Sequence, residues 1–413
     1  MNFDRLRQLL IQKAIEGKLV PQLDEEPTVE QIGEAPAEAS FAIPQKWKWR
    51  QLRMLVAKRR TIDPSSLTED NVQLLSIPAY DNNRAEIINP AEIGSSKKLV
   101  FANDLLVSKI VPHISRAWIV PSAPLPSLAS TEWIVFSSEG FYPEYLRMIF
   151  VSGWFREKML STVSGMGSLK RANPSQVCKE FIPVPPLAEQ RRIVARLNEL
   201  LAVIKQAEDA YTDLQSLGKT LRERILQKAI EGKLVPQLDE EPAVEQIGEA
   251  PDEIPFAIPS KWQWGNFDDV ISTIATKNHQ IQTKEIKSSG KFPVISQSQQ
   301  DIDGFSDDSK KLIPAEKLPC VLFGDHTRIV KKITKPCVIG ADGTKLITSK
   351  FLDNNFLFYL ISSIAPQLRE AGYSRHFKFL RAHPLPVPPL AEQHRIVAKL
   401  NKLLPLVDQM TAV

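Results

Sequence analysis

The sequence of 413 residues has only three cysteines, and none of them forms a CxxC pair: Cys178, Cys320 and Cys337. It therefore has neither a disulfide framework nor a cysteine-pair zinc site, and a reducing cytoplasm is the expected compartment. No apolar run reaches the length that a membrane helix needs. The first ten residues, MNFDRLRQLL, predict a charged amphipathic helix and not a signal peptide.

Motifs for cofactor chemistry are also missing. The loop SGMGSLKR at 164–171 does not fit the Walker A pattern, and GADGTK at 340–345 lacks phosphate-loop spacing. There is no [DN]PP[YF] tetrapeptide, because the proline pairs at Pro185 and Pro388 precede leucine, and no glycine-rich signature for a methyl donor is present. We expect a chain that neither methylates nor hydrolyses a substrate by itself and that binds no metal.

Charge is unevenly distributed along the chain. The net charge is +4, with about +3 in residues 52–182 and about +5 in residues 265–385, whereas the segments that begin at Asp24 and Asp239 are acidic. Excess positive charge in these two regions fits a nucleic acid partner. Scattered lysines kept for solubility explain the charge equally well. With 43% hydrophobic residues, the chain is long enough for two sizeable cores.

The pattern at 187–231 predicts one long helix with a heptad repeat of apolar residues. Pro185 and Pro186 stand where the helix can begin, and Gly232 where it can end. Such a helix is roughly 67 Å long, and its apolar stripe requires a second helix alongside. A helix packed in an ordinary core is the alternative, which the length and the charged remaining faces disfavour.

Two internal repeats supply that second helix. Residues 12–36 recur at 227–251 with one change, and the segment PVPPLAEQRRIVARLNELL from Pro183 recurs from Pro386 with a few changes. The two chain ends are therefore expected to meet, antiparallel to the central helix, which gives a pseudo-twofold internal repeat. The expected interface positions are Leu6, Leu10, Ile193, Leu197, Leu200, Ile204, Leu214, Leu221, Ile225, Ile396, Leu400, Leu403 and Val407. Pro405 is expected to bend or fray the last helix near Leu404.

The expected fold is α+β, with two globular α/β domains joined by a long antiparallel coiled coil. The predicted division is 1–49 (helix and linker), 50–182 (first domain), 183–264 (central helix and linker), 265–385 (second domain) and 386–413 (last helix). The predicted strands are Val72–Ile77, Leu105–Ile110, Trp118–Val120, Trp133–Phe136, Cys320–Phe323, Ile329–Ile333, Cys337–Ile339 and Leu346–Thr348. Predicted helices cover residues 4–16, 143–160 and a segment from Asn354, capped by Asp353 and bent by Pro366.

Aromatic and polar residues beside these elements have competing interpretations. Trp47 and Trp49 recur at the equivalent second position, which favours packing anchors over platforms for base stacking. The glycines of 164–171 let backbone approach a phosphate, although a plain loop after a helix fits nearly as well. Asp325 and His326 suggest acid–base catalysis, but no third orienting group lies nearby in sequence, so a structural or DNA-contact role is favoured.

The duplicated PxPPLAEQxxIV segments, with a heptad helix that ends in QKAIEGKLVPQ, resemble the specificity subunits of type I restriction-modification systems. The segments FGDHTRIV (323–330), VIGADGTK (338–345) and GYSRHFKFL from Gly372 resemble a recurrent type of target-recognition domain. The resemblance covers essentially the whole chain. It implies a non-catalytic subunit in which each domain recognises one half of a bipartite DNA sequence.

The resemblance also implies partners. The helices dock two modification subunits, which bind S-adenosylmethionine and methylate adenine, and restriction subunits that use ATP and Mg²⁺ complete the nuclease. This chain itself is expected to bind no cofactor. The residues expected to contact DNA are Lys58, Arg59, Arg60, Lys97, Lys98, Gly165, Ser168, Lys170, Arg171, His326, Arg328, Lys331, Lys332, Lys345, Tyr373, Ser374, Arg375, His376 and Lys378. The alternatives are a protein-interaction scaffold with two binding domains and a stand-alone nuclease.

Overall fold

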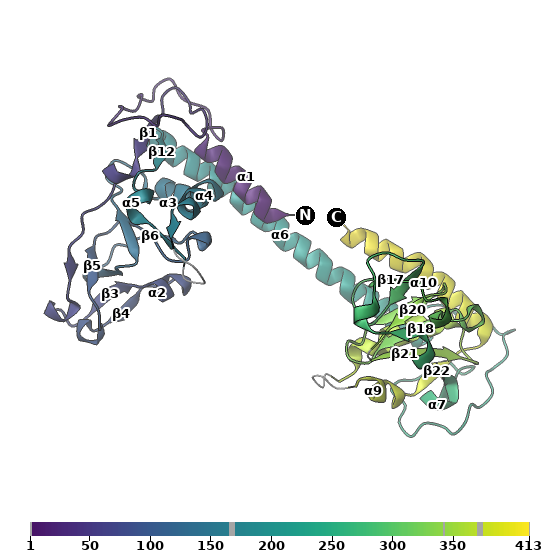
Figure 1. Ribbon diagram of the computed structural model, residues 1–413. Helices are drawn as coiled ribbons and strands as arrows, with labels where there is room; N and C mark the ends of the chain where they lie inside the picture. Colours follow the sequence, from purple (N-terminus) through teal and green to yellow (C-terminus); the bar gives the residue numbers. More distant parts are fainter. Residues whose placement is uncertain (1, 165–169, 342, 370–374, 413) are drawn as a thin grey trace. The chain divides into compact units, whose positions relative to one another are not determined.

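The computed structural model contains a single helix of 44 residues, α6 (Leu187–Ile230), where the sequence predicts a long helix (Figure 1). The structure describes residues 2–164, 170–341, 343–369 and 375–412. These form two units, Met1–Ala210 (unit 1) and Tyr211–Val413 (unit 2), each with its own hydrophobic core. The boundary between the units falls inside α6, so this helix contributes residues to both cores.

Unit 1 contains a five-stranded sheet of order β2-β5-β8-β3-β4 and a three-stranded sheet of order β7-β6-β9. Their strands are β2 (Thr61–Ile62), β3 (Val72–Leu75), β4 (Glu86–Ile88), β5 (Lys97–Val100), β6 (Leu105–Ser108), β7 (Ala117–Ile119), β8 (Ser127–Ser130) and β9 (Trp133–Phe136). The remaining elements before α6 are α1 (Phe3–Ile15), β1 (Lys48–Gln51), α2 (Ile77–Asp81), α3 (Pro143–Val151), α4 (Gly153–Ser161), β10 (Val163–Ser164), β11 (Arg171–Ala172), α5 (Pro174–Val177) and β12 (Phe181–Val184).

The helix predicted over 143–160 is in fact two helices, α3 and α4, because Ser152 interrupts it. Ser152 has an extended backbone (φ −68°, ψ 152°). Its hydroxyl accepts a hydrogen bond from the Phe155 amide at 3.0 Å and donates one to the Ile149 carbonyl at 2.6 Å. A serine that satisfies the first amides of a new helix is a good N-cap, so one residue ends α3 and begins α4.

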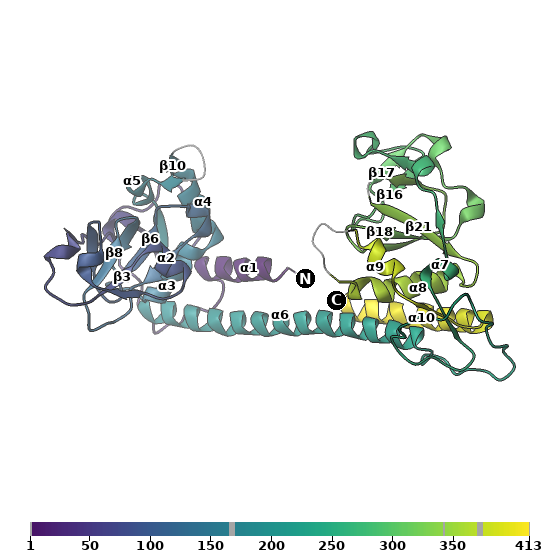
Figure 2. The ribbon, with the colours of Figure 1, turned by 90° about the horizontal axis from the view of Figure 1, so that it is seen from below.

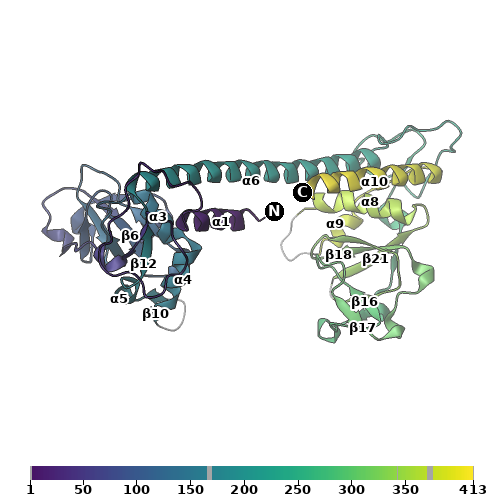
Figure 3. The same ribbon diagram turned by 90° about the horizontal axis from the view of Figure 1, so that it is seen from above.

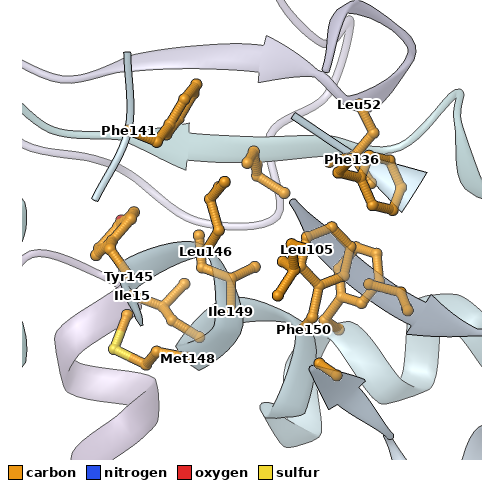
Figure 4. Packing of buried hydrophobic residues seen from close by; sticks show 14 of the residues in the cluster. Ile15, Leu52, Leu105, Phe136, Phe141, Tyr145, Leu146, Met148, Ile149 and Phe150 are labelled. Carbon is orange, nitrogen blue, oxygen red and sulfur yellow. The ribbon is translucent and has the colours of Figure 1, made fainter. Parts of the chain in front are cut away.

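The core of unit 1 forms where α3 lies on the three-stranded sheet (Figure 4). Leu146, Ile149 and Phe150 of α3 are buried, and the Phe150 ring stacks on Phe136 of β9 with centroids 4.9 Å apart. Ile15 of α1 reaches the same cluster. Each fully buried side chain of this kind contributes about 1.5–3 kcal/mol, so the core fastens α1 to the sheet domain.

Unit 2 contains two four-stranded sheets, of orders β14-β21-β18-β19 and β15-β20-β16-β17. Its strands are β13 (Gln263–Gly265), β14 (Ile271–Ile274), β15 (Gln280–Ile281), β16 (Phe292–Ile295), β17 (Gly304–Ser306), β18 (Cys320–Gly324), β19 (Val330–Ile333), β20 (Val338–Gly340), β21 (Thr344–Ser349) and β22 (Leu385–Val387). Its further helices are α7 (Phe267–Val270), α8 (Asn354–Ile364), α9 (Phe377–Arg381) and α10 (Leu390–Thr411). Asp353 caps α8 as predicted, and a 3-10 turn at Ala365–Gln367 follows this helix at Pro366.

In unit 1, α1 lies antiparallel against the first part of α6 (Figure 2). Ile11 shares a buried cluster with Ile193 and Leu197, while near the other end of α1 Arg7 forms an ion pair with Glu208. In unit 2, α10 lies antiparallel against the second part of α6 (Figure 3).

Most of the predicted interface positions between these helices are buried or half-buried. Leu6 is an exception, with 41% of its surface exposed. The prediction for Leu6 is wrong because α1 meets α6 through Arg7 and Ile11, which lie on an adjacent face of the helix. Near the end of α10, Leu404 is buried, and the predicted Leu403 is half-buried beside it.

The helix α10 continues through Pro405 to Thr411, so the predicted bend or fraying at Leu404 does not end it. A proline inside a helix removes one backbone hydrogen bond and costs about 3 kcal/mol. Here the neighbours Leu404 and Val407 are 3% and 5% exposed. Pro405 itself lies on the exposed side. Burial of the two neighbouring side chains offsets the cost of the proline.

Each unit closes its unique region with a pair of strands. β1 pairs with β12, and β13 pairs with β22, both antiparallel. Trp47, just before β1, is 1% exposed, and Trp49 packs on Phe41 with ring centroids 5.2 Å apart. These tryptophans are packing anchors, as predicted. The unique region of each unit therefore starts and ends on neighbouring strands, next to the helices.

Candidate nucleic-acid interface

Loops of unit 2 gather at one edge of its sheets. β15 and β16 both run parallel to β20, with Ile281 opposite Gly340 and Ile295 opposite Ile339. The carboxyl ends of parallel strands meet at one edge of a sheet, which is where open α/β sheets bind ligands. The loops after β16, β18 and β20 contact one another there.

Asp325, the first residue after β18, bonds to two other segments that contain predicted DNA contacts, the turn before β21 and the start of α9. It is 3% exposed. Its amide donates to the Gly343 carbonyl at 2.6 Å. Its own carbonyl accepts from the His376 amide at 2.8 Å and lies 2.9 Å from His376 Nδ1. Its carboxylate accepts from the Phe377 amide at 2.7 Å. The loop after β18, the turn before β21 and the start of α9 therefore form one surface.

These bonds also show what the Asp325 carboxylate contacts. The carboxylate of a catalytic pair orients the imidazole of its histidine. The Asp325 carboxylate instead holds the Phe377 backbone. His376 is 4% exposed and its ring lies against the Asp325 carbonyl. The described contacts of Asp325 with His376 and Phe377 position the loops. His376 thus has a structural contact where a DNA contact was predicted.

Arg328 directs its side chain into the protein. Its backbone is left-handed (φ +60°), and its guanidinium donates to the Leu368 carbonyl at 2.9 Å. This bond ties the loop after β18 to the segment that follows α8.

Lysines and Arg375 complete the basic surface of unit 2. The Lys331 ammonium donates to the Gln300 carbonyl, and burial lowers the pKa of Lys331. The Lys345 ammonium lies 5.7 Å from the Phe377 ring centroid. Arg375, Lys378 and Lys332 are exposed, and Lys332 donates to Asn355 Oδ1 at 3.2 Å.

Three predicted contacts of unit 1 have partners inside the protein. Arg59 donates to the buried Asp104 at 2.7 Å and stacks over Phe101 at 4.8 Å, and its bond to Asp104 raises the pKa of Arg59. The Lys98 ammonium donates to the Trp133 carbonyl at 2.7 Å. Lys97 is 9% exposed and donates to Ser95. Burial lowers the pKa of both lysines. The Lys98 bond connects the five-stranded sheet to the three-stranded sheet, and all three side chains serve contacts inside unit 1.

The other bases of unit 1 face solvent. Lys58, Arg60 and Lys170 are exposed, and Arg171 is exposed while donating to Glu132 at 2.9 Å. The structure therefore leaves these four bases available for phosphate contacts, which remain a prediction. Four further predicted contacts lie outside the described residues: Gly165, Ser168, Tyr373 and Ser374.

Sequence reasoning missed one part of this surface, the segment SQSQQ at 296–300 that follows β16. Gln297 Oε1 accepts a hydrogen bond from the His326 amide at 3.0 Å, and the Gln297 carbonyl accepts one from the Thr327 hydroxyl at 2.9 Å. A run of amide and hydroxyl side chains directly after an apolar strand was the signal that could have identified it.

Metal binding and membrane insertion find no support in the described part of the chain. Within these residues, no three His, Cys, Asp or Glu side chains come together as a metal site. None of the described helices is both long and apolar enough to cross a bilayer.

Comparison with known proteins gives a consistent result. Residues 259–411 match the family described as the type I restriction modification DNA specificity domain. The chain is 22% identical to the type I restriction enzyme EcoAI specificity subunit of Escherichia coli, over 98% of this chain and 90% of that protein. It is 30% identical to the Escherichia coli EcoKI specificity subunit, over 25% of this chain and 21% of that protein.

Solved structures show the same fold. The HsdS subunit from Thermoanaerobacter tengcongensis superposes with a TM-score of 0.60 and 19% identity, over 91% of this chain and 93% of that chain. A chain from a study of the assembly and conformational transition of the type I restriction-modification system gives a TM-score of 0.69 and 19% identity, over 90% and 93% of the two chains. The chain is therefore similar over nearly its whole length to specificity subunits of type I restriction enzymes, its residues 259–411 match their DNA specificity domain, and it shares the fold of the HsdS subunit.

Proposed function

We propose that this chain is the non-catalytic DNA specificity subunit of a type I restriction-modification complex, in which each unit recognises one half of a bipartite DNA sequence. One observation carries the proposal. Both units have nearly identical connectors and paired helices, yet the regions enclosed by β1–β12 and β13–β22 differ in sequence and in strand order. Repeated helices and connectors that carry two different enclosed regions suit a subunit that recognises two different half-sites.

The exposed apolar side chains on the helices support the docking of two copies of one partner. Leu187 of α6 and Leu390 of α10 occupy equivalent repeat positions and are 43% and 58% exposed. Val203 and Leu406 are a second equivalent pair, 61% and 55% exposed. Repeated apolar positions on the surface favour protein contacts. We assign them to two modification subunits, which would carry the S-adenosylmethionine site and the pocket for a flipped adenine.

Electrostatics supports the DNA half of the proposal. The exposed bases of the two units would hold the DNA backbone, and a few donors in the major groove would identify the bases. The contacts to the DNA backbone weaken as salt rises, because binding releases counterions from the DNA.

The test is exchange of one unique region. The complex with its modification subunits is assembled from the natural chain and from a chimera whose residues 50–182 come from another such subunit. Methylated sites are then mapped on genomic DNA. The proposal expects a split motif with modified adenines, one half of which changes in the chimera. A protein-interaction scaffold would show neither sequence dependence nor salt dependence in mobility-shift titrations.

A further inference from the structure

We infer that Gln297 is a positioning residue for DNA recognition by unit 2, through the hydrogen bond that its side chain accepts from the His326 amide. The inference rests on the proposed function and specifies it further. Gln297 follows β16, whereas His326 follows β18, so one side chain connects loops from the two separate sheets of unit 2.

The contacts made by Gln297 fix two consecutive residues of the loop after β18. Its Oε1 accepts from the His326 amide at 3.0 Å, and its carbonyl accepts from the Thr327 hydroxyl at 2.9 Å. Thr327 is exposed. Both the side chain and the backbone of Gln297 thus hold the exposed end of the loop in one conformation.

Close packing around Gln297 holds its side chain in one position. A Cβ on Gly343 would lie 2.8 Å from Gln297 Nε2 and 2.4 Å from His326 Cδ2, and Gly343 has a positive φ of +66°. A Cβ on Gly324 would lie 2.7 Å from the Cβ of Gln297. Gly324 at the end of β18 and Gly343 in the turn before β21 therefore make room for the same side chain, and the three loops pack closely together.

The loop held by Gln297 is connected to the exposed base Arg375. The loop that Gln297 holds begins at Asp325, which in turn holds the amides of His376 and Phe377. Arg375 is exposed directly before this anchored pair. Loss of the Gln297 acceptor frees one end of the loop and loosens the surface that presents Thr327 and Arg375 to DNA. Recognition needs side chains held close to one geometry, so discrimination is the property that falls.

The experiment compares three variants in the assembled complex with its modification subunits. Gln297→Ala removes the acceptor, whereas Gln297→Glu keeps an oxygen that can accept from the His326 amide. Gln246→Ala, in the connector of the same unit, is the matched control, because Gln246 is exposed and its side chain donates to the nearby Gly248 carbonyl. Binding is measured on DNA with the correct target, with the unit 1 half altered, and with the unit 2 half altered.

The expected result is selective. Gln297→Ala lowers discrimination at the unit 2 half-site about tenfold and leaves discrimination at the unit 1 half-site unchanged. Gln297→Glu retains most of the discrimination, which is compared as a ratio because the added charge weakens all DNA binding alike. Gln246→Ala behaves as the natural chain.

Three outcomes overturn the inference: natural discrimination in Gln297→Ala, equal loss at both half-sites, or a Gln297→Glu variant as impaired as Gln297→Ala. Failure of the proposed function is distinct from these, because the natural chain itself would then discriminate at neither half-site.

Discussion

Arg192 of α6 bonds both carboxylate oxygens of Glu26, at 3.0 and 2.7 Å, across 166 residues of sequence. Unit 2 repeats the arrangement with Arg395 and Glu241 at the same two distances. A third donor of each arginine reaches a connector carbonyl, that of Pro21 or Pro236. Both connectors are thus fastened to the beginning of a helix by a bidentate ion pair.

The first prediction concerns these ion pairs. Arg192→Ala leaves the carboxylate of Glu26, which is 7% exposed, without its partner, and should destabilise the connector of unit 1 by about 2 kcal/mol. Hydrogen exchange should rise in residues 18–46 and stay natural in the second connector. Arg395→Ala serves as the reciprocal control, with the opposite pattern. Equal exchange in both connectors of either variant would contradict the prediction.

A second prediction follows from Glu392, which is fully buried at the start of α10. Burial raises its pKa, and a 3.0 Å hydrogen bond from Trp262 Nε1 opposes that shift only in part. When the pKa of a carboxyl is higher in the folded state than in the unfolded state, the protonated group stabilises the fold. This contribution is complete at a pH below the unfolded-state pKa, and it is lost as the pH rises through the folded-state pKa. Glu392→Gln has no proton to lose and still offers Trp262 an acceptor.

The free energy of unfolding of Glu392→Gln minus that of the natural chain should therefore increase from about pH 4 to about pH 7, because the natural chain loses stability over this range and the variant does not. Denaturant titrations at both pH values measure this difference. Glu253→Gln, at an exposed connector position, should show no such trend. A relative stability of Glu392→Gln that falls toward neutral pH would rule out the assigned charge cost.

The third prediction uses Gly218 of α6. Alanine normally stabilises a helix interior by about 1 kcal/mol relative to glycine. At Gly218, however, a Cβ would lie 2.2 Å from Thr411 Cγ2 of α10, and a β-branched side chain in a helix has little freedom to turn away. Gly218→Ala should therefore displace the last turn of α10 and increase hydrogen exchange at 407–411.

The double variant Gly218→Ala with Thr411→Ala tests this steric cause. It removes the obstructing methyl group while keeping the gain in helix propensity, so it should be more stable than the natural chain by about 1 kcal/mol. Thermal unfolding of the two single variants and the double variant gives the coupling. Additive effects of the two substitutions would show that Gly218 and Thr411 do not interact.

The elements predicted from the sequence are those with strong local signals. Every predicted strand coincides with a strand to within a few residues, because apolar runs such as 320–323 and 133–136 are fully buried. The long helix follows from its heptad pattern. Short polar strands such as β5 (KKLV) and β8 (SLAS) were missed, since their residues gain strand structure from their neighbours in the sheet and not from their own pattern.

The candidate site was predicted less completely, because a base in a sequence does not reveal its partner. Arg59 and Lys98 carry the same charge as Arg60 and Lys58, yet a buried Asp104 and the carbonyl of Trp133 bind the first two. These contacts span 45 and 35 residues. Tertiary structure alone separates the bases that hold the fold from those that face solvent.

The fourth prediction concerns thiol reactivity. Burial raises the pKa of Cys320 and of Cys337 to about 12, whereas Cys178 is half-buried. Since the thiolate is the reactive form, iodoacetamide should label Cys178 first in the native chain. Peptide mass spectrometry over time measures the order, and denaturant should abolish the difference. Native labelling of Cys320 as fast as that of Cys178 would contradict this burial.

The last prediction separates the two proposed DNA-binding units. Arg375 is exposed beside the anchored residues His376 and Phe377, so Arg375→Ala should weaken recognition of the unit 2 half-site alone and reduce the salt dependence of binding by about one charge. Arg381→Ala is the matched control, because Arg381 lies in the adjacent helix α9 and bonds Asp268 at 2.7 Å. Binding of the assembled complex at several salt concentrations, with either half-site altered, distinguishes the cases. Equal loss at both half-sites, or at neither, would mean that the two units do not recognise DNA separately, since one exposed base in unit 2 can contact only the DNA that this unit binds.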